Sequence, residues 1–285
     1  MSLVTTKEML KKAQVGRYAV GAFNVENMEM VMAVLAAAEE AQSPVIMQTT
    51  PGTVNYAGFD FYYANVAAAA ARTHVPVVMH LDHGDSFERA MLAYRVGYTS
   101  IMIDGSKRPF EENIALTKSV TDACHPGGVP IEGELGHVGG KEDDLEGGDA
   151  QNPYTDPQEA KTFVERTQVD SLAIGVGTSH GVYKGTPQVK VERVSEIAAV
   201  IDTPLVLHGT SGVPNDQVAE CVKRGICKVN YATDLRIAFT KGIKTYMQED
   251  PEAFDPKKYA KRGMEEVKKY VLQKMQVVGS VGQAK

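Results

Sequence analysis

The sequence contains 285 residues, of which 43% are hydrophobic and 23% are charged, and its formal net charge is -6. This length can bury the core of one large α/β domain or of two small ones, while the acidic balance and the lack of a long Lys/Arg cluster argue against a nucleic-acid or anionic-membrane partner. The three cysteines form no C-x-x-C pair, and no run reaches the roughly 18 apolar residues of a membrane span or resembles a signal peptide, so we expect a cytoplasmic protein without a disulfide framework.

Short apolar runs alternate with helical patterns along the whole chain. The first half predicts, in order, a helix over 7–15, a strand over 18–24, a helix over 26–41, a strand over 45–49, a helix over 59–73, a strand over 75–81, a helix over 87–95 and a strand over 100–104. The second half predicts a helix over 110–123, a strand over 130–134, a helix over 157–167, a strand over 171–174, a helix over 191–201, a strand over 205–208, a helix over 216–224, a strand over 227–230 and closing helices over 235–246 and 259–277.

A glycine- and acid-rich stretch over 135–153 separates the fifth strand from the next helix. It is too long for an ordinary strand-to-helix turn, and long loops in compact domains are often functional. We interpret it as a lid over an active site because it directly follows Glu134. The alternative is a surface insertion without a function.

Eight strands that alternate with helices predict a single (β/α)8 TIM barrel over residues 1–285, with an extended active-site loop after the fifth strand and extra C-terminal helices. An open doubly wound sheet is the alternative. Its dinucleotide fingerprint is missing, however, because no G-x-G-x-x-G follows the first strand, and Gly175-Val176-Gly177 after the sixth strand is weak evidence for a nucleotide.

Three of the seven histidines, His83, His180 and His208, follow the third, sixth and seventh predicted strands. TIM barrels keep their chemistry at the C-terminal ends of the strands. A lone histidine there would more often be structural, but three from separate strands form the ligand set of a catalytic zinc ion with one position left open. The others are given no such role: His74 and His125 precede strands at the opposite rim, His80 is expected to be a hydrogen-bonded core residue, and His137 lies in the long loop.

Acidic residues end three successive strands: Asp82, Asp104 and Glu134. Carboxylates seldom sit in an apolar barrel mouth unless they are paired or bound to a metal. Asp82, next to a predicted ligand, is the expected general acid or base. Asp104 and Glu134 are expected to hold a second cation or to orient the metal ligands. The structural alternative for each, strongest for Asp104, is a helix N-cap.

Small residues follow the last strands, and their exposed backbone N–H groups suit an anion. The region after the seventh and eighth strands is the usual phosphate site of this fold, although tight-turn glycines are the alternative. The predicted phosphate-binding residues are Gly181, Gly209, Thr210, Ser211, Asn230, Tyr231, Ala232 and Thr233.

Together these motifs resemble the zinc-dependent class II fructose/tagatose-bisphosphate aldolase family. The resemblance rests on His80-Leu81-Asp82-His83-Gly84, Glu132-Gly133-Glu134-Leu135-Gly136, Gly139-Gly140-Lys141-Glu142-Asp143, Gly177-Thr178-Ser179-His180-Gly181, Leu207-His208-Gly209 and Lys228-Val229-Asn230, and it runs from the first helix to about Gly282. Within the family the chain is more similar to the tagatose-1,6-bisphosphate branch, through Thr50-Pro51-Gly52-Thr53 and Gly225-Ile226-Cys227-Lys228-Val229-Asn230.

The resemblance implies a reaction and its participants. One zinc ion per subunit on the three histidines would act as a Lewis acid in the cleavage of a ketose bisphosphate, Asp82 would exchange the C4 hydroxyl proton, Glu142 would exchange the C1 proton, and Asn230 would hydrogen-bond the enediolate. It further implies a monovalent cation (Na+ or K+) near the phosphate site, an alternative metal position at Asp104 and Glu134, a homodimer or homotetramer, and an accessory subunit in some systems.

The sequence departs from the family pattern at two places. Asp104-Gly105-Ser106-Lys107-Arg108 stands where the family commonly has Asp-Ala-Ser-His, and Asp234 replaces the usual glutamate after Thr233. Neither departure touches the core chemistry, but both leave recognition of the far end of the substrate open, so the ketose can be tagatose 1,6-bisphosphate, fructose 1,6-bisphosphate or another ketose phosphate. Two further hypotheses are a zinc-dependent hydrolase on the same fold and a catalytically silent sugar-phosphate-binding partner subunit.

Overall fold

The computed structural model describes residues 3–136, 138–142, 145–147, 154–181, 183, 185 and 187–284. For residues 141, 142 and 145–147 it describes the backbone alone. Among the described residues, no helix combines the length and the apolar character needed to cross a membrane.

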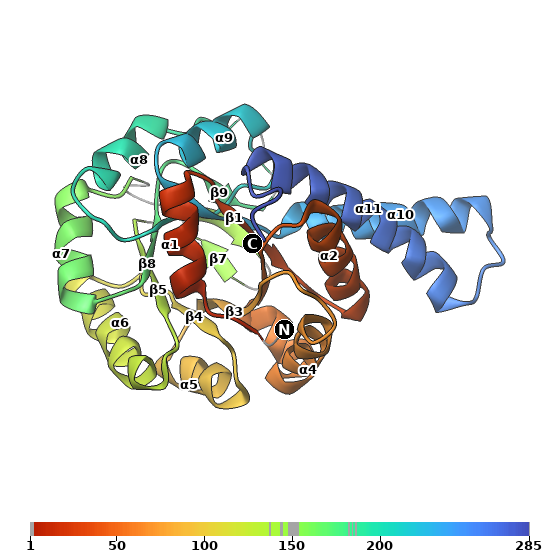
Figure 1. The fold of residues 1–285 in the computed structure, drawn as a ribbon, viewed down its shortest axis with the longest axis horizontal. Helices are drawn as coiled ribbons and strands as arrows, with labels where there is room; N and C mark the ends of the chain where they lie inside the picture. The colour runs from red at the N-terminus through yellow and green to blue at the C-terminus, as the bar shows by residue number, and fades with distance from the viewer. Residues whose placement is uncertain are drawn as a thin grey trace.

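Eight parallel strands close into a barrel in the order β1-β11-β10-β8-β5-β4-β3-β2 (Figure 1). The predicted TIM barrel is therefore confirmed and the open sheet is excluded. Residues in these strands are buried on both faces, as expected for a sheet lined by its own core inside and covered by helices outside. The strands are β1 (Val20–Asn24), β2 (Val45–Thr49), β3 (Val77–Gly84), β4 (Ser100–Ile103), β5 (Ile131–Leu135), β8 (Ser171–Ile174), β10 (Leu205–Leu207) and β11 (Ile226–Tyr231).

Helices surround the barrel wherever the sequence shows 3.6-residue apolar periodicity. The outer helices are α2 (Met28–Ala41), α4 (Phe59–Ala70), α5 (Phe87–Val96), α6 (Phe110–Cys124), α7 (Pro157–Thr167), α8 (Val191–Ala198) and α9 (Asn215–Lys223). Two short helices were not predicted, namely α3 (Pro51–Ala57), which Thr50 caps, and the 3-10 turn η1 (His125–Gly127).

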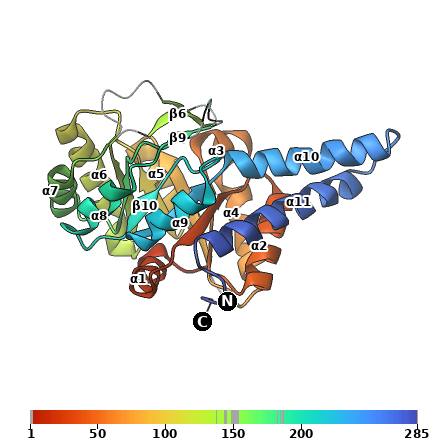
Figure 2. The same cartoon turned by 90° about the horizontal axis from the view of Figure 1, so that it is seen from above.

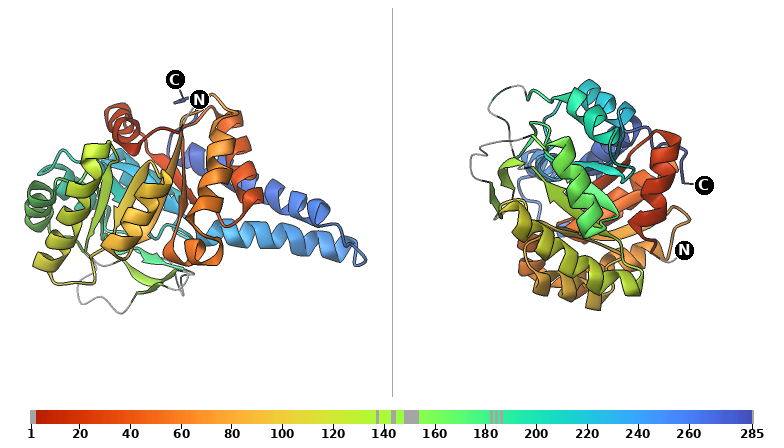
Figure 3. Two further views of the ribbon diagram at one scale, coloured as in Figure 1. Left: turned by 90° about the horizontal axis from the view of Figure 1, so that it is seen from below. Right: turned by 90° about the vertical axis from the view of Figure 1, so that its left-hand side faces the viewer.

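The last two helices, α10 (Thr233–Glu249) and α11 (Pro256–Val277), form an antiparallel pair that projects beyond the barrel (Figures 2 and 3). α10 begins two residues before the predicted position, so Thr233 lies at a helix N-terminus rather than in a loop. α11 packs against α2 and α10.

The long stretch after β5 contains strands that the sequence did not predict. β6 (Gly139–Glu142) pairs antiparallel with β7 (Leu145–Gly147) and parallel with β9 (Ser179–His180), forming a small sheet beside the barrel. Glycine-rich, strongly polar sequence does not favour strands, so tertiary pairing overrides local propensity here. Residues 137, 143, 144 and 148–153 of this stretch lie outside the described residues.

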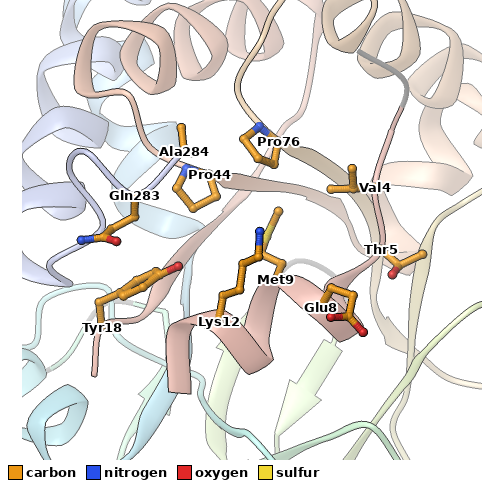
Figure 4. Close-up of a pocket in the computed structure, with 10 residues that line it drawn as sticks. All are labelled: Val4, Thr5, Glu8, Met9, Lys12, Tyr18, Pro44, Pro76, Gln283 and Ala284. Atoms are coloured by element: carbon orange, nitrogen blue, oxygen red, sulfur yellow. The ribbon is translucent and has the colours of Figure 1, made fainter. Parts of the chain in front are cut away.

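Helix α1 (Thr6–Gly16) covers the N-terminal end of the barrel, where Met9, Leu10 and Ala13 pack onto the interior residues of the strands. A hollow of about 370 Å³ lies beside it, with Met9 and Tyr18 facing Pro44 and Pro76 (Figure 4). None of the predicted site residues lines this hollow. The candidate site is therefore sought at the other end, where the strands finish.

Candidate metal centre and active site

The end of β3 carries two adjacent functional side chains at one mouth of the barrel. Successive side chains of a regular strand point to opposite faces, but His83 has a φ of 49°, and the register between β3 and β4 shifts between Leu81 and Gly84. This irregularity breaks the alternation, so Asp82 and His83 both reach the site. His83 Nε2 lies 4.0 Å from Asp82 Oδ1.

The structure brings together the three histidines that the sequence predicted as metal ligands. His83 comes from β3, His180 from β9, and His208 directly follows β10. One ligand nitrogen from each lies within 4.8 Å of the others, and the rings are steeply inclined to one another. His83 Nε2 and His208 Nδ1 are 3.0 Å apart.

Carboxylates on the outer side of two of these rings fix the nitrogens that face inward. His83 Nδ1 lies 2.9 Å from Asp104 Oδ2, and His208 Nε2 lies 2.9 Å from Glu132 Oε1. A histidine that donates one N–H to a carboxylate presents the lone pair of its other nitrogen to a metal ion. Asp104 and Glu132 therefore direct His83 Nε2 and His208 Nδ1 toward the centre of the cluster.

The electrostatics of this cluster suit a cation. Burial alone would lower the pKa of His83, but the carboxylates of Asp82, Asp104 and Glu134 outweigh it and raise that pKa well above its ordinary value. The pKa values of His180 and His208 are lowered well below normal, first by burial and then by repulsion from His83. Two imidazoles thus stay neutral, as metal ligands must be, while the acids around the third attract positive charge.

A second set, formed by His83, Asp104 and Glu134, also offers three ligand atoms within 4.8 Å of one another. Burial, followed by the neighbouring charge of Asp104, raises the pKa of Glu134 well above its ordinary value. Asp104 Oδ1 also accepts from the Ser106 N–H and hydroxyl in the turn after β4, but it caps no helix, because the N-cap of α6 is Pro109; the N-cap alternative for Asp104 is therefore wrong. The donor sets fit a metal ion at the three histidines and, through the shared His83, at this adjacent position.

Three amide side chains hold the carboxylate of Asp82. Gln48 and Asn24 donate to Oδ2 at 2.9 and 3.2 Å, and Asn230 donates to Oδ1 at 3.0 Å. Asn230 was predicted for the site, whereas Asn24 and Gln48 were missed. The sequence signal for both was a polar residue at or near the end of a fully buried strand. Burying such a side chain costs free energy unless it is hydrogen-bonded.

Two of the predicted phosphate-binding segments, residues 209–211 and 230–233, meet at the end of β11. Gly209 has a φ of 65°, and the Thr210 hydroxyl donates to the backbone carbonyl of Asn230. Ser211 Oγ accepts from the Asp234 N–H at 3.4 Å in the first turn of α10. Gly181 follows β9, and Tyr231, Ala232 and Thr233 connect β11 to α10.

The two departures from the family pattern occupy different environments. Asp234 accepts from the Gly212 N–H at 3.2 Å and from the Tyr270 hydroxyl at 2.8 Å, so its carboxylate ties the loop after β10 to α11. Lys107 and Arg108 are exposed. These facts assign Asp234 a structural contact and leave the two cations at the surface.

The predicted lid is joined directly to a predicted metal ligand, because Gly139 and Gly140 of β6 pair with Ser179 and His180 of β9. Gly140 has a φ of 92°, and a Cβ atom built there would lie 2.2 Å from the carbonyl oxygen of His180. Glu142 ends β6, and its side chain lies outside what the structure describes. The base of the lid and the position of His180 are therefore coupled.

Replacing Gly140 with alanine is expected to displace His180 and to weaken zinc binding by about tenfold or more, the usual cost of disturbing a ligand's support. Gly128 provides the control, since its φ is 76° but nothing lies within 4 Å of a built Cβ, so Gly128→Ala introduces backbone strain without the clash. Competition with a chromophoric chelator measures both affinities. Equal affinities for the two variants would contradict this coupling.

The remaining histidines are placed largely as predicted. His80 is fully buried and hydrogen-bonded, which confirms its expected place in the core. His74 is exposed, and His125 lies 2.7 Å from Asp170 Oδ2 before β5. His137 lies outside the described residues.

Comparison with known proteins identifies the family of this chain. The family model described as fructose-bisphosphate aldolase class-II matches residues 4–283. The chain belongs to this class II aldolase family. Its fold is similar to that of the YdjI aldolase from Escherichia coli K12, with 37% identity and a TM-score of 0.88 over 99% of this chain and 100% of that one.

Two further solved structures share the fold. A crystal structure from Coccidioides immitis, assigned as a fructose-1,6-bisphosphate aldolase, is 29% identical, with a TM-score of 0.90 over 97% of this chain and 96% of that one. The fructose-bisphosphate aldolase of Campylobacter jejuni is 23% identical, with a TM-score of 0.83 over 98% of this chain and 96% of that one, and it supports the fold alone.

Proposed function

We propose that this class II aldolase is zinc-dependent and reversibly cleaves a ketose 1,6-bisphosphate, with D-tagatose 1,6-bisphosphate as the expected substrate, to dihydroxyacetone phosphate and D-glyceraldehyde 3-phosphate. Fructose 1,6-bisphosphate is the alternative. The observation that carries the proposal is the convergence of His83, His180 and His208 beside the buried carboxylate of Asp82. We also expect a homodimer or homotetramer, as the family resemblance implies.

Asp82 is proposed to remove the proton from the C4 hydroxyl during cleavage and to return it during condensation. As that proton leaves, the C4–O bond becomes a carbonyl, the C3–C4 bond breaks, and its electron pair moves toward the C2 carbonyl oxygen. When held by the three histidines, zinc would supply the Lewis acidity that polarises this carbonyl. The amides of Asn24, Gln48 and Asn230 support Asp82 in one orientation, which is what general acid–base catalysis requires.

Asn230 is proposed to donate a hydrogen bond to the oxygen on which charge develops, because its amide lies between Asp82 and the His208 ring, 3.0 Å from Asp82 Oδ1 and 3.3 Å from His208 Nε2. Glu142 on β6 is proposed to exchange the C1 proton. The C1 phosphate is assigned to Gly181, to residues 209–211 and to residues 230–233, where the loop after β10 meets the N-terminus of the 17-residue helix α10.

The preference for tagatose rests on the segment from Thr50 to Thr53 and on the β11 sequence. Thr50 caps α3 immediately after β2, the strand that carries Gln48, so this segment lies at the same end of the barrel as Asp82. A segment in this position can contact the C4 end of a ketose. Its sequence is the basis for testing tagatose 1,6-bisphosphate first.

A coupled assay of tagatose 1,6-bisphosphate and fructose 1,6-bisphosphate, run side by side with zinc and after chelation, tests the proposal. Chelator-sensitive cleavage of either compound is the expected result, and the ratio of their kcat/KM values names the substrate. Failure of the zinc-loaded enzyme to cleave either compound would overturn the bisphosphate assignment. Metal-dependent hydrolysis without carbon–carbon cleavage would instead favour the hydrolase hypothesis.

A further inference from the structure

A chain of buried polar side chains runs through the barrel interior from the metal centre toward α1. Glu132, which contacts His208, accepts a hydrogen bond from Lys228 at 2.8 Å through its other oxygen. Lys228 Nζ lies 3.3 Å from His80 Nε2, and His80 Nδ1 lies 2.8 Å from Ser100 Oγ. Ser100 Oγ in turn lies 2.9 Å from the hydroxyl of Thr6, the first residue of α1. Lys228 and His80 are both fully buried, and neither was predicted as a site residue.

The chemistry of these groups determines which atom donates and which accepts in each of these hydrogen bonds. A lysine ammonium group has three donors and no acceptor, so Glu132 Oε2 and His80 Nε2 must both accept from Lys228. His80 consequently donates through Nδ1 to Ser100. Burial, followed by the charge of Lys228, lowers the pKa of His80 well below its ordinary value, in agreement with a neutral ring. Both oxygens of Glu132 are therefore occupied, one by Lys228 and one by His208.

The stability of the fold is a weak reason for this arrangement. A buried ion pair is often no more stabilising than apolar side chains of similar volume, because both charges lose their hydration. The part of the barrel interior next to α1 is packed with apolar side chains such as Val20, Ala22, Ile46 and Val78, and a methionine at position 228 would extend this apolar packing. A role in the orientation of Glu132 accounts for a lysine at that position.

We propose that Lys228 is a positioning residue for the metal centre: it fixes the Glu132 carboxylate so that Glu132 accepts the Nε2 proton of His208 and leaves His208 Nδ1 free to bind a metal ion. This inference rests on the proposed three-histidine site. It does not depend on which ketose is cleaved, since metal binding is measured without substrate.

The arrangement predicts an unusual effect of combining two substitutions. In Glu132→Gln, Lys228 still requires an oxygen acceptor and therefore draws the amide oxygen to itself. The amide NH2 group then faces His208 Nε2, which favours the histidine tautomer that is protonated on Nδ1, the nitrogen needed for the metal. In Glu132→Gln/Lys228→Met, the amide is free to turn its oxygen toward His208.

The experiment compares E132Q, K228M and the double variant in apo-protein, by Zn2+ affinity against a chromophoric chelator and by the Co2+ ligand-field spectrum. We expect E132Q to bind Zn2+ about 10- to 100-fold more weakly than the unchanged protein, as for other losses of a ligand's hydrogen-bond partner. We expect the double variant to bind Zn2+ about tenfold more tightly than E132Q, which corresponds to the free energy of one buried hydrogen bond. It should also regain the tetrahedral Co2+ spectrum. A double variant that binds as weakly as E132Q or more weakly would overturn the proposal, because a purely structural pair gives additive losses.

Lys274→Met is the matched control, because Lys274 is also buried but bonds Asn215 and lies over the Tyr231 and Tyr270 rings rather than near Glu132. Its Zn2+ affinity should be unchanged. If E132Q does not fold, E132M/K228M replaces it as the reference, since it has no unpaired buried charge and offers His208 no acceptor at position 132. The proposal then requires E132Q/K228M to bind Zn2+ about tenfold more tightly than E132M/K228M, and equal affinities would refute it.

Discussion

Replacing Asp82 with alanine is expected to lower kcat for ketose-bisphosphate cleavage by about 10²- to 10⁴-fold, the usual contribution of a positioned acid or base. The metal ligands should remain in place, because Asp82 lies 4.0 Å from His83 Nε2 and is not among the three histidine donors. The variant should therefore retain zinc and substrate while losing the chemical step. Steady-state kinetics and metal analysis of the same preparation test both parts.

Asp85→Ala is the matched control for this prediction. Asp85 follows the same strand, but it is exposed and its carboxylate pairs with Arg89 on α5. Because an exposed ion pair contributes little to stability, the loss of this carboxylate should leave the fold intact and cleavage within about twofold of normal. Near-normal turnover of Asp82→Ala would remove Asp82 from the mechanism. Loss of zinc from that variant would instead reassign Asp82 to metal binding.

The barrel could be predicted because its signals are local. Each buried strand is a short apolar run, each outer helix has an apolar stripe, and their alternation leaves few alternative architectures. The β6–β9 sheet could not be predicted in the same way. Its strands are glycine-rich and polar, and they form because Gly139 and Gly140 pair with Ser179 and His180, about forty residues further along the chain.

The sequence predicts those residues of the candidate site that lie at or just beyond the ends of strands. His83 lies near the end of β3, His180 lies in β9 beyond the end of β8, and His208 directly follows β10, so the order of strands and helices places all three at one mouth of the barrel. The irregularity at His83 was not predictable, because it depends on a register shift against β4. Without that shift, Asp82 and His83 would point to opposite faces of β3, and no sequence pattern distinguishes the two cases.

The groups that support the site are the part that sequence reasoning missed. Asn24 and Gln48 lie on neighbouring strands and converge on Asp82 through the barrel interior, while Glu132 on β5 and Lys228 on β11 meet across the interior from strands that are not neighbours. Each is a polar residue within a short, mostly apolar strand, and the sequence pattern alone does not show what it contacts. Their partners lie 24 to 148 positions away in the sequence, so only the closed barrel identifies them.

Replacing His208 with alanine is expected to abolish stoichiometric zinc binding and to lower cleavage by at least about 10³-fold, because the several kcal/mol of transition-state stabilisation that a metal ion supplies would be lost with it. His208 provides one of three inward-facing nitrogens and is the partner of Glu132. Its removal leaves two histidine ligands and a buried carboxylate without its imidazole. Metal content after dialysis, activity after zinc reconstitution and thermal unfolding of the apo-protein test the outcome.

His125→Ala separates this effect from the loss of any histidine, since His125 pairs with Asp170 before β5, away from the strand ends that carry the metal ligands. That variant should hold zinc and cleave substrate normally. A His208→Ala protein that still binds one zinc ion per subunit would break the three-histidine assignment and shift the metal to His83, Asp104 and Glu134, the adjacent donor set. Because the two sets share His83, the deciding variant is His208→Ala/Glu134→Ala, which removes a donor that belongs only to the adjacent set and should then release the residual zinc.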